Sequence, residues 1–358
     1  MKTFTFAAGL FLATGAVTAA AAQEVLTVYA PDYFVSEWGP GPKIEELFEA
    51  QCGCDLQFKP GELLPRIMLE GDRTEADVVI GLNTDVTQKA RESGLFAPHG
   101  VDLSPLTLPL DWTDEVFLPF NYGHTAFVYD ATKMEPPASL EAMETLPEDV
   151  RIVIQDPRTS ISGLALVLWI KSVYGDEAGT FWEALAPNIV TVTKGWSESY
   201  GLFTDGEADM VLSYTTSPAY HIIAEGDETK KAAIFPEGHY FMVELAAKVA
   251  GSDQPELAQQ FMDFILSHDF QSMIATGNWS IPAALPKDEW PEGFQQLDLP
   301  EEVIFYSEDE AAALIGGGQH GPGAMAGVGP HDLQRIGFVA GLAKAVIEGG
   351  GEIGRRVD

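Results

Sequence analysis

Residues 151–174, RIVIQDPRTSISGLALVLWIKSVY, decide the fold class. Within them, 151–155 reads as a strand and 163–174 as a buried helix, with a polar turn between. The same alternation recurs outward along the chain. Further strands are predicted at 25–29, 55–58, 78–82, 125–129, 189–192, 210–214 and 240–249, and helices at 42–51, 63–70, 86–93, 200–206 and 255–266. Strands that alternate with helices favour an α/β fold with parallel sheets.

The strand–helix units form two sets with no long linker between them. We therefore predict two α/β lobes: lobe 1 from 23–120 and 247–314, and lobe 2 from 121–246, with hinge crossings near 121–129 and 238–246. A ligand would lie in the cleft between the lobes, where the carboxyl ends of strands face a crevice. One large doubly wound domain is the alternative. The Gly-rich segment 315–358 predicts a poorly ordered tail.

The N-terminus predicts export. A short positive start at Met1-Lys2 precedes an apolar run to about residue 17 and small residues up to Ala22. This order is typical of a signal peptide cleaved after Ala22, at residues 1–22. A membrane anchor is the alternative, but the run is shorter than the ~20 apolar residues that span a bilayer. We expect a mature protein located in the periplasm.

The chain is strongly acidic, with 54 Asp and Glu against 20 Lys and Arg and a formal net charge of -34. Nucleic acid is excluded as an expected partner because phosphate backbones attract the opposite charge. The field would attract a cationic small ligand. A surface selected for solubility explains most of the excess equally well.

The two cysteines, Cys52 and Cys54, stand two residues apart. Two ligands do not make a structural zinc site. An exported protein allows a disulfide, which Gly53 would make easier, and two free thiols are the alternative. The sequence also contains no nucleophile elbow, zinc-protease motif, P-loop or dinucleotide fingerprint. We predict no catalytic residue, metal ligand or cofactor, which favours binding over catalysis.

Two hydroxyl-rich turns each follow a predicted strand and precede a predicted helix. The first contains Thr159, Ser160 and Ile161, and the second contains Tyr214, Thr215, Thr216 and Ser217. Unpaired N–H groups and a partial positive charge mark helix N-termini, so such hydroxyls either cap the helix or help bind an anion. Both interpretations stay open for each turn.

Aromatic residues gather near strand ends and in Gly-rich turns. These are Tyr33, Trp38, Trp196, Tyr214, Tyr220 and Trp279. Aromatic faces bind flat heterocycles and cations, at ~0.5–2 kcal/mol for each cation–π contact. Packing in the core or on the surface is the alternative for each residue.

The turns resemble those of the periplasmic thiamine-binding proteins of bacterial ABC importers. Matching stretches run in the same order from about Leu26 to Trp279: LTVY, WGPGP, ADVVIGL, SGLFAP, FLPFNYGHTAFVYD, QDPRTS, GLALVLW, VTVTKGWSESYGLF, VLSYTTSPAYHI, EGHY, QPELAQQFMDF and TGNW. The resemblance implies a type II periplasmic binding protein fold. It also implies that thiamine, thiamine monophosphate or thiamine diphosphate is the transported ligand, and that a monomer delivers it to permease and ATPase subunits.

The resemblance also assigns residues. It implies ligand contacts at Thr159, Ser160 and Ile161, at the segment from Tyr214 to Ser217, and at Trp196. Aromatic residues matching Trp38, Tyr220 and Trp279 would line the pocket, and Asp32 and Tyr33 complete the candidate set. The chain departs from the family pattern at Pro31, where Tyr33 is a substitute aromatic, in the shorter loop at 58–62, and in the tail from about residue 315.

Two alternatives to thiamine stay open. In the first, the protein is still the receptor of an importer, but its ligand is a polyamine or an iron–anion complex; the aromatic turns favour a flat ring instead. A secreted enzyme that degrades thiamine phosphates is the alternative from a different class.

Overall fold

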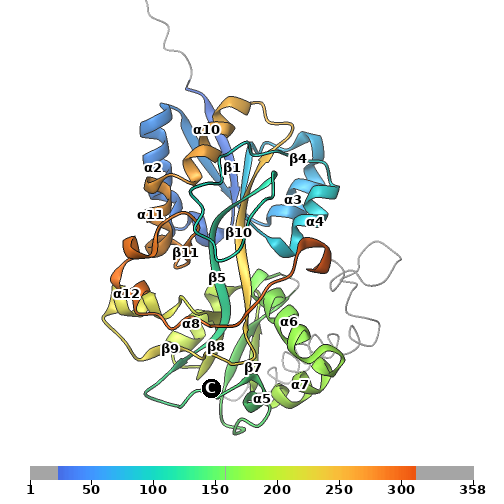
Figure 1. The fold of residues 1–358 in the computed structure, drawn as a ribbon, viewed down its shortest axis with the longest axis vertical. Coiled ribbons are helices and arrows are strands. Elements are labelled where there is room, and N and C mark those ends of the chain that lie inside the picture. Colours follow the sequence, from blue (N-terminus) through green and yellow to red (C-terminus); the bar gives the residue numbers. More distant parts are fainter. Residues whose placement is uncertain (1–22, 158, 312–358) are drawn as a thin grey trace, which may run out of the picture.

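A computed structural model describes residues 23–157 and 159–311 (Figure 1). The predicted signal peptide at 1–22 and tail at 315–358 lie outside these residues. Figure 1 shows one group of strands and helices in the upper half and a second group in the lower half, with two long strands running through both. Within the described ranges, no helix has the length and apolar character needed to cross a membrane.

The upper strands have the order β2-β1-β3 and continue through β10 to β5. They are β1 (Val25–Ala30), β2 (Asp55–Pro60) and β3 (Val78–Asn83). β1 pairs in parallel with both neighbours, as the strand–helix alternation predicted. All of β3 is buried, which explains why its sequence is a nearly continuous apolar run.

Helices pack on both sides of the upper strands (Figure 1). They are α1 (Asp32–Val35), α2 (Gly41–Cys52), α3 (Leu63–Glu70), α4 (Thr87–Glu92), α10 (Pro255–Ile265) and α11 (His268–Gly277). Ile44 and Phe48, four residues apart on α2, are buried on one face, and the Phe48 ring meets the Phe261 ring at 5.0 Å. Burial of each such side chain stabilises the fold by about 1.5–3 kcal/mol.

α2 ends at Gly53, which adopts φ 69°, a left-handed conformation that favours glycine. Cys52 and Cys54 on either side of it are joined by a disulfide. Of the two states open from the sequence, the disulfide is therefore the one observed, and no free cysteine occurs among the described residues.

The lower strands have the order β5-β8-β6-β7, and β9 also pairs with β5. They are β6 (Ile152–Gln155), β7 (Ile189–Thr193), β8 (Met210–Tyr214) and β9 (Lys230–Ala232). Around them lie α5 (Leu140–Met143), α6 (Ile161–Tyr174), α7 (Ala178–Leu185), α8 (Trp196–Thr204), α9 (Pro218–Tyr220) and a π-helical turn, η5 (His221–Glu225). β6 pairs in parallel with β7 and β8, which gives this half its own α/β core.

Two long antiparallel strands connect the halves: β5 (Phe117–Asp130) and β10 (His239–Val249). β5 pairs with β10 over its first part and with β8 and β9 over its last part. The predicted crossings at 121–129 and 238–246 fall largely on these strands. The lobe boundaries themselves stay a prediction.

β5 is longer than the strand predicted at 125–129, because its first part pairs with β10, a segment far away in the sequence. Pro119 pairs with Leu245 next to a register shift between Glu244 and Leu245. Such irregularities tolerate a residue that lacks an N–H group.

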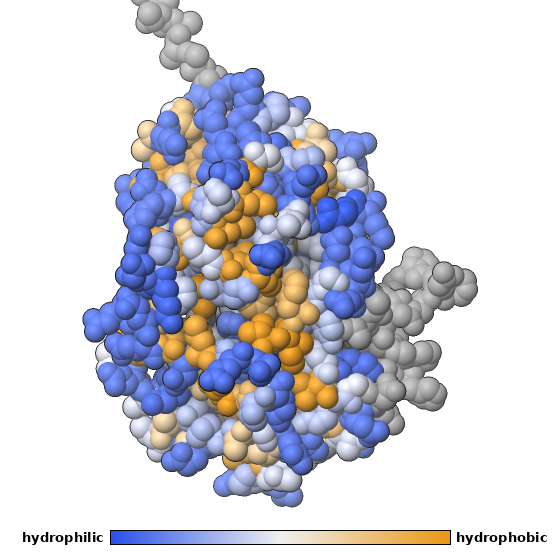
Figure 2. Space-filling view, in the orientation of Figure 1, coloured by the Kyte–Doolittle hydropathy of each residue, from blue (hydrophilic) through white to orange (hydrophobic). Residues whose placement is uncertain are grey.

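Short elements complete the described chain. The strands are β4 (Phe96–Ala97), β11 (Ile281–Pro282) and β12 (Val303–Ile304), and one further helix is α12 (Glu292–Gln295). The 3-10 turns are η1 (Gly71–Arg73), η2 (Thr84–Val86), η3 (Gly175–Glu177), η4 (Ala186–Asn188) and η6 (Lys287–Glu289). Figure 2 shows a mostly hydrophilic face on which apolar side chains gather along the middle of the molecule.

Candidate ligand-binding site

The first hydroxyl-rich turn begins α6. Ser160 is the N-cap residue, and its Oγ accepts a hydrogen bond from the Gly163 N–H at 3.4 Å. The exposed Thr159 donates its hydroxyl to the Lys194 carbonyl at 2.7 Å, which connects this turn to the start of α8. The capping interpretation of Ser160 is therefore observed. Gly163 has no room for a side chain, since an added Cβ would lie 2.5 Å from the Gln155 carbonyl oxygen.

The second hydroxyl-rich turn follows β8. Ser217 Oγ and Ser213 Oγ lie 2.6 Å apart, and the Tyr214 hydroxyl lies 2.5 Å from Ser162 Oγ on α6. Thr215 and Thr216 are buried. The predicted helix after this turn is only the three residues of α9, which continue directly into the π-turn η5. The two turns are thus brought together by the Ser162–Tyr214 contact.

Trp196 lies in the first turn of α8, which begins four residues earlier than the helix predicted at 200–206. Gly195 is the extended N-cap, and the Lys194 N–H reaches the Glu198 carboxylate in the first turn at 3.3 Å. Trp196 donates its indole N–H to Ser213 Oγ at 2.7 Å. Its ring stacks on Tyr200 with centroids 4.7 Å apart. The indole is thereby held beside the second hydroxyl-rich turn.

Behind Trp196, the Tyr200 hydroxyl is hydrogen-bonded to His221 Nε2 at 2.9 Å. His221 Nδ1 in turn lies 2.7 Å from Glu225. Ligand atoms of His221, Glu225 and Asp227 all lie within 4.8 Å of one another, which is compatible with a metal ion. The Asp227 carboxylate already accepts from the Thr229 N–H and from Lys230 Nζ, so we assign no metal to this cluster.

Two further candidates meet across the molecule. Tyr220, at the end of α9, and Trp279, after α11, contact edge to face with centroids 5.1 Å apart. The turn before Trp279 packs on the WGPGP turn, because a Cβ on Gly277 would lie 2.8 Å from Pro40. Trp38 in that turn is half-exposed.

Tyr33 and Asp32 lie on α1, directly after β1. Asp32 is exposed, whereas the Tyr33 hydroxyl donates a hydrogen bond to the carboxylate of Glu244 on β10. The Glu244 carboxylate also accepts from Asn121 Nδ2 at 2.5 Å and from Asn278 Nδ2 at 2.8 Å. Asn278 is the neighbour of Trp279, so Glu244 connects α1, β5 and the Trp279 turn.

Glu244 was missed in the sequence, as was Asp85 in η2, directly after β3. The Asp85 carboxylate accepts from the Tyr240 hydroxyl at 2.5 Å and from Asn83 Nδ2 at 2.7 Å. The signal for Glu244 was available: it is a single acidic residue inside the apolar run HYFMVELAAKV. All of β10 except Lys248 is buried, and a charged group in such a strand requires specific partners.

Burial dominates the electrostatics of these groups. It raises the pKa of the Glu244 carboxyl, and the hydrogen bonds from Tyr33, Asn121 and Asn278 oppose part of that rise. It raises the pKa of Asp85 to about 6. Burial also raises the pKa of the Tyr214 hydroxyl, and the carboxyls of Glu244 and Asp85 add to that increase. Tyr214 therefore lies within electrostatic reach of both acids.

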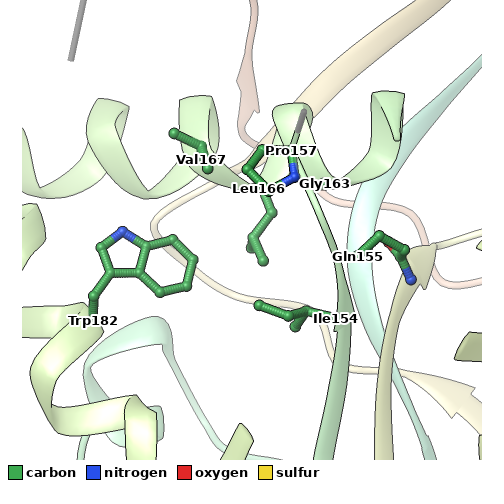
Figure 3. Close-up of a pocket in the computed structure, with 7 residues that line it drawn as sticks. All are labelled: Ile154, Gln155, Pro157, Gly163, Leu166, Val167 and Trp182. Atoms are coloured by element: carbon green, nitrogen blue, oxygen red, sulfur yellow. The ribbon is translucent and has the colours of Figure 1, made fainter. Parts of the chain in front are cut away.

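A small pocket lies elsewhere, between β6, α6 and α7 (Figure 3). Ile154, Leu166 and Trp182 point into it, and its lining also includes Gln155, Pro157, Gly163 and Val167. None of the candidate site residues lines it. Its apolar lining and its place behind the first hydroxyl-rich turn indicate a packing defect in the lower core rather than the binding site.

The comparisons with known proteins agree with this architecture. Residues 40–272 match the family model of the bacterial extracellular solute-binding proteins. A thiamine-binding periplasmic protein of Escherichia coli K12 is 48% identical over 297 residues, which cover 82% of this chain and 90% of the relative. One from Brucella abortus is 46% identical over 308 residues, covering 85% and 92%.

A solved structure described as a periplasmic thiamin binding protein superposes with a TM-score of 0.79 at 48% identity, covering 81% of this chain and 92% of that one. The fold is therefore that of the periplasmic binding proteins. Because the matches extend over most of each chain, this protein belongs to the bacterial extracellular solute-binding proteins.

Proposed function

We propose that this protein is the periplasmic thiamine receptor of an ABC importer, binding thiamine, thiamine monophosphate or thiamine diphosphate. The observation that carries the proposal is its 48% identity to the thiamine-binding relative of E. coli over 90% of that relative's length. Membership of the solute-binding family makes it a receptor rather than an enzyme. Permease and ATPase subunits are its proposed partners, and the receptor acts as a monomer.

The geometry supports a site between the two proposed lobes, 23–120 with 247–314 and 121–246. The Trp196–Tyr200 stack and the Tyr220–Trp279 pair present aromatic surface, which suits the two flat rings of thiamine. The buried carboxyls of Glu244 and Asp85 both raise the pKa of Tyr214, and their negative field suits a cationic ligand. Closure of the lobes on the ligand would signal occupancy to the permease.

We propose that the ligand contacts the residues predicted from the sequence. On the lower half these are Thr159, Ser160, Ile161, Trp196, Tyr214, Thr215, Thr216, Ser217 and Tyr220, and on the upper half Asp32, Tyr33, Trp38 and Trp279. The Ser160 hydroxyl oxygen already caps α6. The same hydroxyl would donate its hydrogen to the phosphate of an ester while it caps the helix. Asp32 and Trp38 are exposed and would reach the ligand only at its edge.

Intrinsic tryptophan fluorescence of the mature protein tests the proposal, because Trp196 and Trp279 belong to the candidate site. We expect a saturable change with thiamine or one of its esters at micromolar concentrations. A fluorescence change with spermidine or a ferric complex, and none with thiamine, would show that the transported ligand is a polyamine or iron instead of thiamine. Chromatography of thiamine diphosphate after incubation with the protein would reveal a product if the protein were an enzyme.

A further inference from the structure

The buried carboxyl of Glu244 has only neutral hydrogen-bond donors. Its side chain is 4% exposed, and its donors are the Tyr33 hydroxyl and the amides of Asn121 and Asn278. Within residues 23–157 and 159–311, no Lys, Arg or His forms an ion pair with it, and no cation contributes to its pKa. An ionised carboxylate in such a place lacks a compensating positive charge.

Its surroundings add to the negative charge. Asn83 of β3 is the register partner of Glu244 across the β3–β10 ladder, and Asn83 Nδ2 donates to Asp85. Both carboxyls act electrostatically on Tyr214, a candidate ligand contact from β8. Two carboxyls of the upper half thus add to the burial that raises the pKa of one tyrosine of the lower half.

Two buried polar atoms, one on Asn83 and one on Thr215, have no partner among the described residues. Asn83 and Thr215 are fully buried, and neither Asn83 Oδ1 nor Thr215 Oγ1 has a hydrogen-bond partner in the part of the chain that the structure describes. Buried polar atoms of folded proteins are nearly always paired. These two atoms, on residues that lie close to Asp85 and Tyr214 in the sequence, are therefore available to a polar ligand.

We propose that Glu244 determines charge specificity, as the counter-ion that selects a ligand carrying a positively charged ring over a neutral ligand of the same shape. This inference rests on the proposed function, because Glu244 is linked to two candidate ligand contacts. Tyr33 donates to Glu244 directly, and Trp279 follows another of its partners, Asn278. A cationic ring beside the carboxylate offsets the cost of burying that charge, whereas a neutral ring leaves the cost in place.

The test compares thiamine with its neutral thiophene isostere, in which carbon replaces the charged ring nitrogen, by calorimetry. The wild type is expected to bind thiamine at least about tenfold more tightly. Glu244→Gln is expected to weaken thiamine binding by about tenfold while changing isostere binding by less than about twofold. Glu244→Asp, which keeps the charge, is expected to keep the preference for thiamine.

Equal loss of both ligands in Glu244→Gln would overturn the proposal, because Glu244 would then be structural or would act on the pyrimidine ring. If Glu244→Gln fails to fold, the proposal is tested by the ratio of affinities for thiamine and the isostere in the wild type and in Glu244→Asp. Equal affinities of the wild type for both ligands would overturn the proposal. A wild type that binds neither ligand contradicts the proposed function instead.

Asp77→Asn is the matched control. Asp77 is a buried carboxyl just before β3, and it accepts from the Thr27 N–H at 2.8 Å and from Ser252 Oγ at 2.6 Å, away from the candidate site. This substitution removes one buried negative charge from the same sheet. Asp77→Asn should keep the wild-type preference for thiamine over the isostere. If this preference falls equally in Asp77→Asn and Glu244→Gln, the effect comes from the overall charge of the protein and the proposal is overturned.

Discussion

Tyr220 and Trp279 touch edge to face, with ring planes at 87° to one another. Tyr220 follows β8 in the lower half and Trp279 follows α11 in the upper half, so the contact bridges the two groups of strands. Trp279 is also the single non-glycine residue with positive φ, 53°, in the described chain. Bulky residues seldom adopt this conformation, which costs about 1–3 kcal/mol and is concentrated at functional sites.

We predict that this pair encloses the ligand. Trp279→Ala and Tyr220→Ala should each weaken thiamine binding by about 1–3 kcal/mol, because an aromatic face against the cation is lost. The double variant should lose less than the sum of the two, since the residues contact one another. Calorimetric titration measures all three. Trp290→Phe, which removes an indole bonded to the Leu285 carbonyl, is the control and should bind normally.

Trp196 should contribute through both its ring and its indole N–H. Trp196→Ala is predicted to weaken binding by about 1–3 kcal/mol. Trp196→Phe keeps a ring to stack on Tyr200 but removes the bond to Ser213, so the loss should be smaller. Thiamine affinities of the two variants check this order. Unchanged affinity in Trp196→Ala would remove Trp196 from the site.

Ser160→Ala separates capping from ligand binding. Loss of the Ser160–Gly163 bond should lower the free energy of unfolding by about 1 kcal/mol, measured by urea denaturation. If Ser160 also contacts phosphate, the affinity for thiamine monophosphate should fall more than that for thiamine. Equal changes for both ligands would leave Ser160 as a helix cap only.

Asp85 predicts a pH dependence of stability. Its pKa is about 6 in the folded protein against an ordinary value of 3.8. The folded state therefore holds this proton more tightly than the unfolded state. The resulting stabilisation is complete below about pH 4 and is lost as the pH rises to about 6, by roughly 3 kcal/mol in total.

Asp85→Asn removes that contribution and keeps an acceptor for Tyr240. Urea denaturation of both proteins between pH 4 and 7 should show a stability difference that changes across this range and levels off above pH 6. A pH-independent difference would show that Asp85 does not titrate there. The comparison with the variant cancels contributions from the other acidic residues.

Local patterns predicted most of the elements, because periodicity and Gly or Pro at element ends are local signals. The helix at 63–70 and the strand at 210–214 coincide with α3 and β8. α8 was placed too late, because the Gly195 that begins it was read as part of a loop around Trp196. The first part of β5 was not predicted, because it is held by pairing with β10, a segment distant in the sequence.

The candidate site was harder to predict, because its contacts join distant segments. Turns with hydroxyl and aromatic residues are visible in the sequence, but the bond between Ser162 and Tyr214 depends on how α6 packs against β8. Glu244, Asn121 and Asn278 come from three separate parts of the chain, and only their juxtaposition shows that the donors to Glu244 within the described residues are neutral.

Calorimetric titration of the mature protein with thiamine and its two phosphate esters tests the central claim most directly. We predict saturable binding of at least one of them, one ligand per chain, at micromolar or lower concentrations. Absence of heat with all three, in a preparation shown to be folded by its cooperative unfolding, would contradict the assignment of this protein as a thiamine receptor.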